Sequence, residues 1–444
     1  MTILEQAKNL LETLPLCDHC LGRQFALLGH GLSNDKRGYA IKLLLVAEAD
    51  RALRENEKKG KQDLMLLVKN SLNQVALSTA IARGFAVKGI EQKCGLCRDT
   101  FANLPIYAEK ARRCLNDYEF ESFLVGIRVP TDVVELEDEL RARFNLVYGE
   151  SIRNEFSREI GKRIQASTSK AVDLQHPQVL VMIDPFNDEV SLEINSIYIS
   201  GRYRKFERNL PQSRWLCRRC QGRGCEQCGG TGKLYQESVE ELIGIPAMTV
   251  AGGVGYHLHA AGREDVDVRT LGSGRPFVLE VIQPRKRNLN LHELTNLINK
   301  SSNGKVEVSG LKISSKDEVR RLKEKGQGEK TYRAMVEFDR EIEESELERL
   351  KNALVGQPLS QLTPIRVMHR RTLKERKKYI YELEARKLQA NRAELIIRCQ
   401  GGLYIKEFIS GDEGRTKPSV AEILGVSARC IELDVIDVNL GDSK

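Results

Sequence analysis

One carboxylate in the second half of the chain has neighbours that could make it a nucleophile. Asp265 lies in residues 262–269 (GREDVDVR), between Arg263 and Arg269. Nearby positive charge lowers the pKa of a carboxylic acid, so we expect Asp265 to be ionised, as a nucleophile must be. The same spacing is also typical of an ordinary cluster of surface salt bridges, so the pattern alone leaves both interpretations open.

Two later segments bring tyrosines and a lysine that could complete a site. Tyr332 lies in the strand-like stretch 330–334 (KTYRA), and Tyr404 and Lys406 lie in residues 401–412 (GGLYIKEFISGD). If the second stretch is a strand, Tyr404 and Lys406 share one face and both can point into one cleft. The alternative for Tyr332 is a tyrosine packed in the core.

Eight of the eleven cysteines form four Cys-x-x-Cys pairs, two near the N-terminus and two in tandem Cys-x-x-Cys-x-Gly-x-Gly repeats over residues 217–232. This spacing lets the backbone turn round one Zn²⁺ at about 2.3 Å from each sulfur. We therefore expect structural zinc, although the tandem repeat could instead be a redox or a vestigial pair. The expected ligands are Cys17, Cys20, Cys94, Cys97, Cys217, Cys220, Cys225 and Cys228. The isolated Cys114, Cys399 and Cys430 are expected to fill the core.

Length and composition limit the class of protein. A chain of 444 residues exceeds what one core usually supports, which predicts two or three domains. No apolar run approaches the roughly 20 residues that cross a bilayer, and the start of the chain does not resemble a signal peptide, so we expect a cytoplasmic protein with no membrane partner. The net charge of +8 comes from the part after residue 200, which fits a polyanionic partner without proving one.

Hydrophobic periodicity predicts an α+β, multidomain chain. Residues 1–115 form a zinc-organised accessory module, with a helix over 2–14 and two helices over 36–83. Residues 116–205 alternate strands (123–127, 177–184 and 191–200) with helices (133–143 and 152–165), and a turn covers 184–188. Residues 206–444 form a third domain with a cysteine-repeat insertion at 215–233, a helix over 291–300 and a hairpin of 378–384 with 393–399. Residues 252–255 (GGVG) lack the spacing of a phosphate loop and are interpreted as a turn.

The segment around Asp265 resembles a known family. The string GREDVDVRTLGSGRPFVLEV over residues 262–281 closely resembles the archaeal and eukaryotic tRNA pseudouridine synthase family numbered ten, and the family's nucleophile falls on Asp265. Residues 201–215, 238–242 and 363–371 also resemble that family, as do the two N-terminal cysteine pairs. Residues 120–205 are similar to a THUMP domain, an RNA-binding module, most clearly at 173–177 (DLQHP).

This resemblance implies a fold and a reaction. The fold would be a zinc-bound N-terminal module, a THUMP-like domain and a catalytic domain with a mixed or antiparallel central sheet. The reaction would be isomerisation of uridine to pseudouridine at positions 54 and 55 of the tRNA T loop. The flipped base would stack on Tyr332 and contact Tyr404, Lys406 would pair with Asp265, and Arg263 would contact the substrate. Whether Asp265 bonds to C1′ or assists formation of a glycal stays open. Zinc would be structural, no organic cofactor is implied, and a monomer is expected.

Basic side chains outside the motifs are candidates for phosphate contacts, although each alone could be an ordinary surface charge. They are Arg202, Arg204, Lys205, Arg285, Lys286, Arg370 and Arg371.

Other classes of protein fit less well. A DnaJ-type cochaperone would share the cysteine repeat but needs a His-Pro-Asp tripeptide, which the sequence lacks. A THUMP-bearing methyltransferase or thiolation enzyme needs a nucleotide-binding loop after a strand, and none is found. An RNA-binding protein without catalytic activity is the third alternative.

Overall fold

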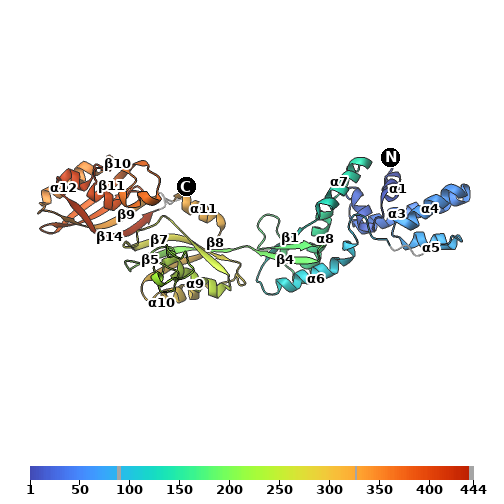
Figure 1. Ribbon diagram of the computed structural model, residues 1–444, viewed down its shortest axis with the longest axis horizontal. Coiled ribbons are helices and arrows are strands. Elements are labelled where there is room, and N and C mark those ends of the chain that lie inside the picture. Colours follow the sequence, from blue (N-terminus) through green and yellow to red (C-terminus); the bar gives the residue numbers. More distant parts are fainter. Residues whose placement is uncertain (88–91, 326–327, 440–444) are drawn as a thin grey trace. The chain divides into compact units, whose positions relative to one another are not determined.

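The computed structural model describes residues 1–87, 92–325 and 328–439, and the chain divides into two compact units, Met1–Asn195 and Ser196–Lys444 (Figure 1). Each unit has its own β-sheet. No helix of the described residues combines the length and the apolar character that crossing a membrane requires.

Helices make up most of the first unit. Its elements before the sheet and around it are α1 (Ile3–Thr13), α2 (Asp18–Gly22), η1 (Arg23–Phe25), α3 (Asn34–Glu55), α4 (Glu57–Asn70), α5 (Gln74–Ala82), η2 (Thr100–Asn103), α6 (Leu104–Leu115), α7 (Thr131–Phe144) and α8 (Ile152–Thr168). The expectation of two helices over residues 36–83 was wrong, because this region contains α3, α4 and α5. Asn56 and Asn73 cap the N-termini of α4 and α5 by accepting backbone N–H groups, and such caps start new helices.

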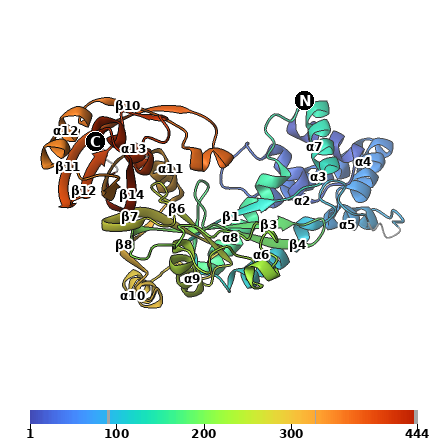
Figure 2. The same cartoon turned by 60° about the vertical axis from the view of Figure 1, so that its left-hand side comes forward.

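A four-stranded sheet completes the first unit. It contains β1 (Ser122–Ile127), β2 (Ala171–Val172), β3 (Val179–Asp184) and β4 (Glu189–Ile194), in the order β2-β1-β3-β4. Asp184 makes the predicted turn between β3 and β4, its Oδ1 accepting the N–H groups of Phe186 and Asn187. Helices α6 and α8 pack on each other and against this sheet (Figure 2). One hydrophobic cluster runs from Ala7 to Ile183, so residues 1–115 and 116–195 share a core.

The boundary between the units lies earlier than the sequence-based boundary at residue 205. The strand expected over residues 191–200 is two strands in two sheets. β4 ends at Ile194, and β5 (Ile197–Lys205) pairs with strands of the second unit. The side chains of Ile197, Ile199 and Tyr203 are buried in the core of that second unit, which explains the assignment of β5.

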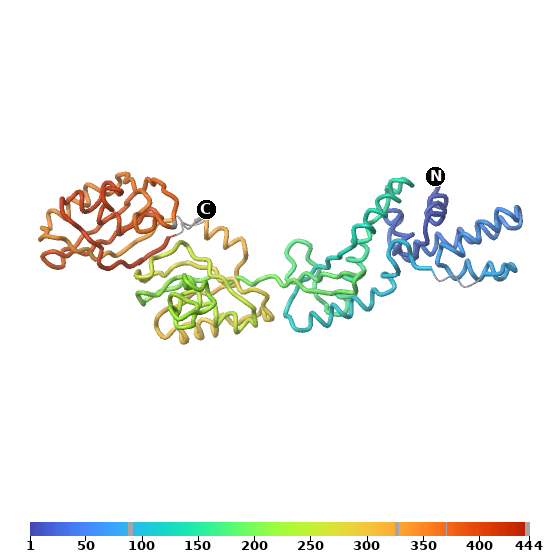
Figure 3. Tube along the Cα trace, viewed as in Figure 1, coloured from blue at the N-terminus to red at the C-terminus, as the bar shows by residue number. Residues whose placement is uncertain are grey.

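In the described part of the chain, the second unit is built on a ten-stranded sheet. Figure 3 traces the backbone of this unit, coloured from green to red. The strand order is β13-β10-β11-β12-β9-β14-β7-β5-β8, with β6 paired to β7. Besides β5, its strands are β6 (Gly255–Ala260), β7 (Arg269–Ile282), β8 (Val306–Ser314), β9 (Glu329–Phe338), β10 (Pro358–Leu362), β11 (Glu375–Gln389), β12 (Arg392–Cys399), β13 (Thr416–Lys417) and β14 (Ala428–Asn439). Its helices are η3 (Glu226–Cys228), α9 (Val239–Ala251), α10 (Leu291–Ser301), α11 (Lys316–Lys325), α12 (Glu344–Leu354), η4 (Ile365–Arg370), α13 (Ile405–Ser410) and α14 (Val420–Leu424).

Several elements of this unit confirm the sequence-based predictions. The helix expected over 291–300 is α10, the expected hairpin is β11 with β12, and residues 252–254 form a turn between α9 and β6. The strands of this sheet pair antiparallel, except for β7 and β14, which run parallel. In this parallel pair Arg269 lies opposite Asp434, and Thr270 lies opposite Val435. At this short parallel seam the two halves of the sheet meet, each with its own hydrophobic cluster. The loops around the seam form the candidate site.

Candidate active site

The loop between β6 and β7 carries the acidic motif and is held from below by a buried ion pair. Glu264 points into the protein, where its Oε2 lies 2.9 Å from Nε of Arg275 and its Oε1 accepts the Tyr203 hydroxyl at 2.9 Å. Both side chains of the ion pair are almost completely excluded from solvent. Gly262 has φ +83, a left-handed backbone conformation that favours glycine at this point of the loop.

Asp265, the next residue, lines a cavity of about 600 Å³ in the second unit. Nη1 of Arg366 lies 2.9 Å from Asp265 Oδ2 and 3.0 Å from Oδ1. Lys406 Nζ is 3.9 Å from Asp265 Oδ2 and 2.6 Å from Asp267 Oδ2. Lys406 thus lies near Asp265, as the resemblance implied, but its closer partner is Asp267 and the direct partner of Asp265 is Arg366. Burial alone would raise the pKa of Asp267, but the hydrogen bond and charge of Lys406 outweigh it, and the pKa is lowered.

The position of Arg269 in the motif predicted that its charge lies beside Asp265, but Arg269 pairs with a different carboxylate. Its guanidinium makes two hydrogen bonds of 2.9 Å to the carboxylate of Asp434 on β14. Asp434 is 2 % exposed and also pairs with Arg208 and Arg333. Arg269 therefore helps to hold the parallel seam between β7 and β14 together, and its charge is used there.

Both candidate tyrosines line the same cavity as Asp265. Tyr332 comes from β9, as expected, and burial raises its pKa, so its hydroxyl stays protonated at neutral pH. Tyr404 is not in a strand, which corrects the expectation: it is the N-cap residue of α13. Lys406 lies in the first turn of that helix and still reaches the cavity, because the helix starts at the cavity wall.

The basic residues proposed to contact phosphates have different environments. Lys205 is completely buried and donates to the carbonyl oxygens of Leu210 (2.7 Å) and Val266 (3.1 Å), so the expectation of a phosphate contact was wrong. Burial lowers the pKa of Lys205 to about 8. Arg202 donates to the backbone carbonyls of Ser273, Gly274 and Val438.

The other candidates lie nearer the surface. Arg204 pairs with Glu307. Arg285 and Lys286 are exposed, and Arg371 is exposed and lines the cavity that contains Asp265. The side chain of Arg370 lies outside the described residues.

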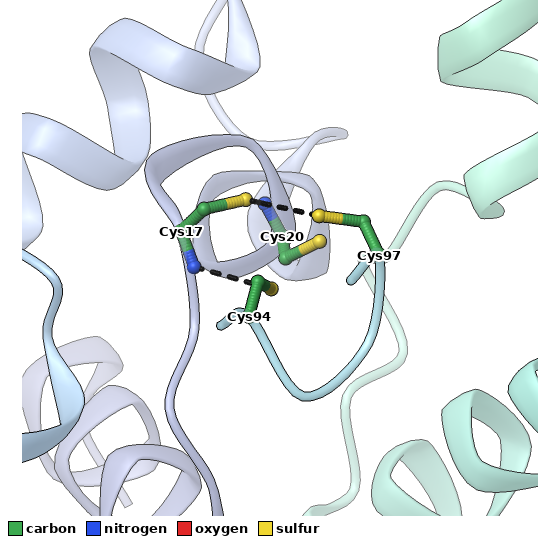
Figure 4. A group of neighbouring side chains, drawn as sticks. All are labelled: Cys17, Cys20, Cys94 and Cys97. Atoms are coloured by element: carbon green, nitrogen blue, oxygen red, sulfur yellow. Dashed lines mark hydrogen bonds between the residues drawn. The ribbon is translucent and has the colours of Figure 1, made fainter. Parts of the chain in front are cut away.

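The four N-terminal cysteines form one cluster within the core of the first unit. Cys17 and Cys20 stand at the start of α2, Cys94 and Cys97 follow on a separate loop, and the four side chains converge in Figure 4. All four sulfurs lie within 4.8 Å of one another, and Cys17 Sγ and Cys97 Sγ are 3.6 Å apart. Thiolates around a tetrahedral ion with bonds of about 2.3 Å would be about 3.8 Å apart. The cluster therefore fits a metal ion.

The tandem repeat forms a second cluster with the same donors. Sγ of Cys217 is 3.8 Å from that of Cys225, and Sγ of Cys220 is 3.8 Å from that of Cys228. The N–H groups of Cys225 and Gly232 donate to Cys228 Sγ, as is favourable for a thiolate. This cluster could also hold a metal ion. Among the isolated cysteines, Cys399 is buried, but Cys114 is exposed and Cys430 half-buried, so only the first fills the core as expected.

Comparisons with known proteins agree over almost the whole chain. Residues 198–439 match the family described as "Pus10, C-terminal", and residues 107–184 match "Pus10 THUMP domain, archaeal". A protein of Methanothrix thermoacetophila called tRNA pseudouridine synthase Pus10 is 41% identical over 98% of this chain and 94% of its own length. The protein of the same name in Methanocaldococcus jannaschii is 40% identical over 97% of this chain and 93% of its own length. The chain belongs to the Pus10 family.

Membership of the Pus10 family establishes the class of activity and the architecture. The chain is an enzyme of the pseudouridine synthase class, an isomerase, with an N-terminal four-cysteine cluster, a THUMP domain and a catalytic domain built on a mixed sheet. Among solved structures, a Cbf5-Nop10-Gar1 complex matches 44% of this chain and 44% of that one at 14% identity, with a TM-score of 0.28. A score this low supports no inference about the chain.

Several residues of this candidate site were not found from the sequence. Arg366 lies in the segment 363–367 (TPIRV), which resembles the family but indicated no role, and it is 101 residues from Asp265. The buried Glu264 and the cavity-lining Lys330 stood next to residues that were singled out. Only the pairing of distant loops identifies these contacts.

Proposed function

We propose that this chain isomerises uridine to pseudouridine at positions 54 and 55 of the tRNA T loop, with Asp265 as the nucleophile. The observation that supports the site is the convergence of Asp265, Tyr332, Tyr404 and Lys406 on one cavity of about 600 Å³, within the range of small-molecule sites. The curated relatives carry the name tRNA pseudouridine synthase, which supports tRNA as the substrate.

The target nucleotide leaves its stack at a cost of a few kcal/mol and enters the cavity, where its base stacks on Tyr332 and contacts Tyr404. Arg366 and Lys406 orient the Asp265 carboxylate, with nitrogens 2.9 Å and 3.9 Å from its Oδ2. Asp265 then bonds to C1′ or assists loss of the C2′ proton to give a glycal, and in either case the N1–C1′ bond breaks. The uracil rotates and C5 bonds to C1′, which breaks the Asp265–C1′ bond of the first route or is accompanied by return of a proton to C2′ of the glycal in the second. C5 then loses its proton and N1 gains one. Substrate and product are isomers, so no oxidant or energy source is consumed.

The rest of the cavity wall suits an anionic polymer. Residues 371–378, which include the start of β11, contribute five basic side chains to the lining. They are Arg371, Lys374, Arg376, Lys377 and Lys378. Lysine and arginine at such a rim release counterions from phosphates, and binding becomes weaker as salt increases. We propose that Arg371, Arg285 and Lys286 contact phosphates, that Arg263 contacts the substrate, and that both cysteine clusters hold structural zinc.

The substitution Asp265→Ala tests the assignment. The expected result is a folded protein that binds a tRNA transcript with wild-type affinity and forms no pseudouridine. Asp317→Ala, which changes an exposed aspartate on α11, is the matched control and should keep full activity. Transcripts with cytidine at position 54 or 55 identify the sites. Pseudouridine formation by purified Asp265→Ala at the wild-type rate would contradict the assignment.

A further inference from the structure

The second cysteine cluster belongs to a small ribbon that approaches the catalytic loop. Residues 215–235 fold back on themselves through a bridge between Leu216 and Lys233 and a hydrogen bond of 2.9 Å from Leu234 N to the carbonyl of Trp215. The buried hydrophobic side chains of this ribbon are those of Cys217 and Cys220. A module with so little apolar core depends on a cross-link such as a bound metal for its shape.

The stem of the ribbon contacts an arginine of the catalytic loop. The rings of Trp215 and Tyr235 meet edge to face, with centroids 5.5 Å apart. The guanidinium carbon of Arg263 lies 5.2 Å from the centre of the Trp215 ring, within the range of a cation–π interaction. Arg263 lines the cavity and precedes Asp265 by two residues.

The ribbon is also tied to the catalytic loop at its root. The amide of Gln212 donates to the carbonyl of Gly262 at 3.0 Å and to Oε2 of Glu264 at 3.1 Å. On the other side, Lys233 pairs with Glu241 on α9. Gln212 and Lys233 are thus held whether or not the cluster binds metal. The position of Trp215, in contrast, depends on the fold of residues 216–232.

We propose that metal binding by Cys217, Cys220, Cys225 and Cys228 positions Arg263 at the catalytic cavity through its contact with Trp215. Trp215 is then a positioning residue, and the ribbon is part of the substrate-binding apparatus. This inference rests on the proposed function, because Arg263 is taken to contact the RNA. Its consequence is that loss of metal from the second cluster lowers catalytic efficiency without unfolding the catalytic domain.

Fluorescence tests the contact without any activity measurement. Trp215 is the only tryptophan of the chain, so its emission reports on this place alone. We expect Arg263→Gln to change the emission, since it removes the cation from the ring. The double variant Cys225→Ser/Cys228→Ser should lose one equivalent of zinc and change the emission in the same direction. Emission unchanged in either protein would overturn the proposal.

A double-mutant cycle tests the consequence for substrate. Trp215→Ala, Cys225→Ser/Cys228→Ser and Arg263→Gln are each expected to lower kcat/KM for a tRNA transcript on the order of tenfold to a hundredfold, as small displacements of substrate-positioning groups do. When Trp215→Ala or the cysteine double substitution is combined with Arg263→Gln, kcat/KM should fall by less than about a further twofold. The effects of residues that act through one another are not additive. Trp215→Phe, which keeps an aromatic face, should restore most of the activity.

The outcomes separate this proposal from the proposed function. Additive losses in the cycle, or wild-type kinetics in Trp215→Ala, would overturn the role of Trp215. If the wild-type protein formed no pseudouridine in tRNA, the proposed function would fail, and the fluorescence measurement would still decide whether the cluster and Arg263 are coupled. Far-UV circular dichroism and melting curves show that each variant is folded.

Discussion

The Arg366 guanidinium joins Asp265 to Glu407: its Nη1 lies 2.9 Å from Asp265 Oδ2, and its Nε donates to Glu407. The Glu407 side chain is 6% exposed, so it holds Arg366 from the buried side, and Arg366 lines the cavity. The contacts of Arg366 Nη1 with both oxygens of Asp265 limit the rotation of that carboxylate. The orientation of the proposed nucleophile therefore depends on an arginine from η4 as well as on Lys406.

Replacement of Arg366 should reduce the rate of the chemical step. We expect Arg366→Gln to lower kcat about tenfold to a hundredfold, because a hydrogen bond to a charged group is worth roughly 1.5–3 kcal/mol. Arg366→Lys, which keeps the charge but cannot reach both carboxylates with a fork of donors, should lose less. Single-turnover kinetics on a tRNA transcript measure the effect. The exposed Arg386→Gln on β11 is the control, and equal rates for it and Arg366→Gln would show that the ion pair is dispensable.

The ring of Tyr332 should matter more than its hydroxyl. Stacking of a base on an aromatic ring is worth roughly 1–3 kcal/mol, so Tyr332→Ala should weaken kcat/KM by about tenfold to a hundredfold, whereas Tyr332→Phe keeps the ring and most of the activity. Tyr381→Ala, at an exposed tyrosine on β11, serves as the control for loss of a ring. A large loss in Tyr332→Phe together with unchanged RNA affinity would instead assign the role to the hydroxyl.

The buried Lys330 should make stability depend on pH above neutrality. Burial, with the nearby Arg275, lowers the pKa of Lys330 to about 8, whereas an unfolded chain has it at about 10.4. The unfolded state therefore binds more protons between these values, and the free energy of unfolding rises as the pH increases from 8 towards 10. Lys330→Met should remove this part of the rise, amounting to about 3 kcal/mol, while Lys205 contributes in the same direction and remains.

Urea unfolding at pH 7.5 and 9.5 measures this difference. Lys312→Met, at an exposed lysine on β8, should behave as the wild type. Identical pH dependence in the wild type and Lys330→Met would mean that Lys330 does not titrate in this range.

The two cysteine clusters should contribute unequally to stability. Cys17→Ser is expected to release one equivalent of zinc and to lower the Tm of the first unit by roughly 10 °C, because this cluster lies in the core and metal binding is coupled to folding. Cys228→Ser should also release one equivalent, with a change in Tm of only a few degrees, since the ribbon is largely exposed. Cys114→Ser, at an exposed cysteine, should change neither quantity. Metal content by elemental analysis and thermal melts provide the comparison, and full zinc in Cys17→Ser would exclude that residue as a ligand.

Local patterns predicted much of the fold. Alternating apolar residues identified β1, β3 and the β11–β12 hairpin, and helical periodicity identified α7, α8 and α10. The predictions failed where a polar side chain or a partner distant in sequence sets the bounds of a helix or strand. The N-caps Asn56 and Asn73 divide a helical stretch. The boundary between the two units falls inside residues 191–200, which look like one continuous strand in the sequence.

By itself the sequence determined the family, the cysteine pairs and the position of Asp265, because each is written in neighbouring residues of characteristic type and spacing. Tertiary structure alone decided which charges meet. Arg269, four residues from Asp265, pairs with Asp434, and Arg366, far along the chain, reaches Asp265 instead. Lys205 became a buried lysine although its neighbours look like a basic surface. Coulomb interactions and burial depend on distance in space, and only the packing of loops around the seam of the sheet sets those distances.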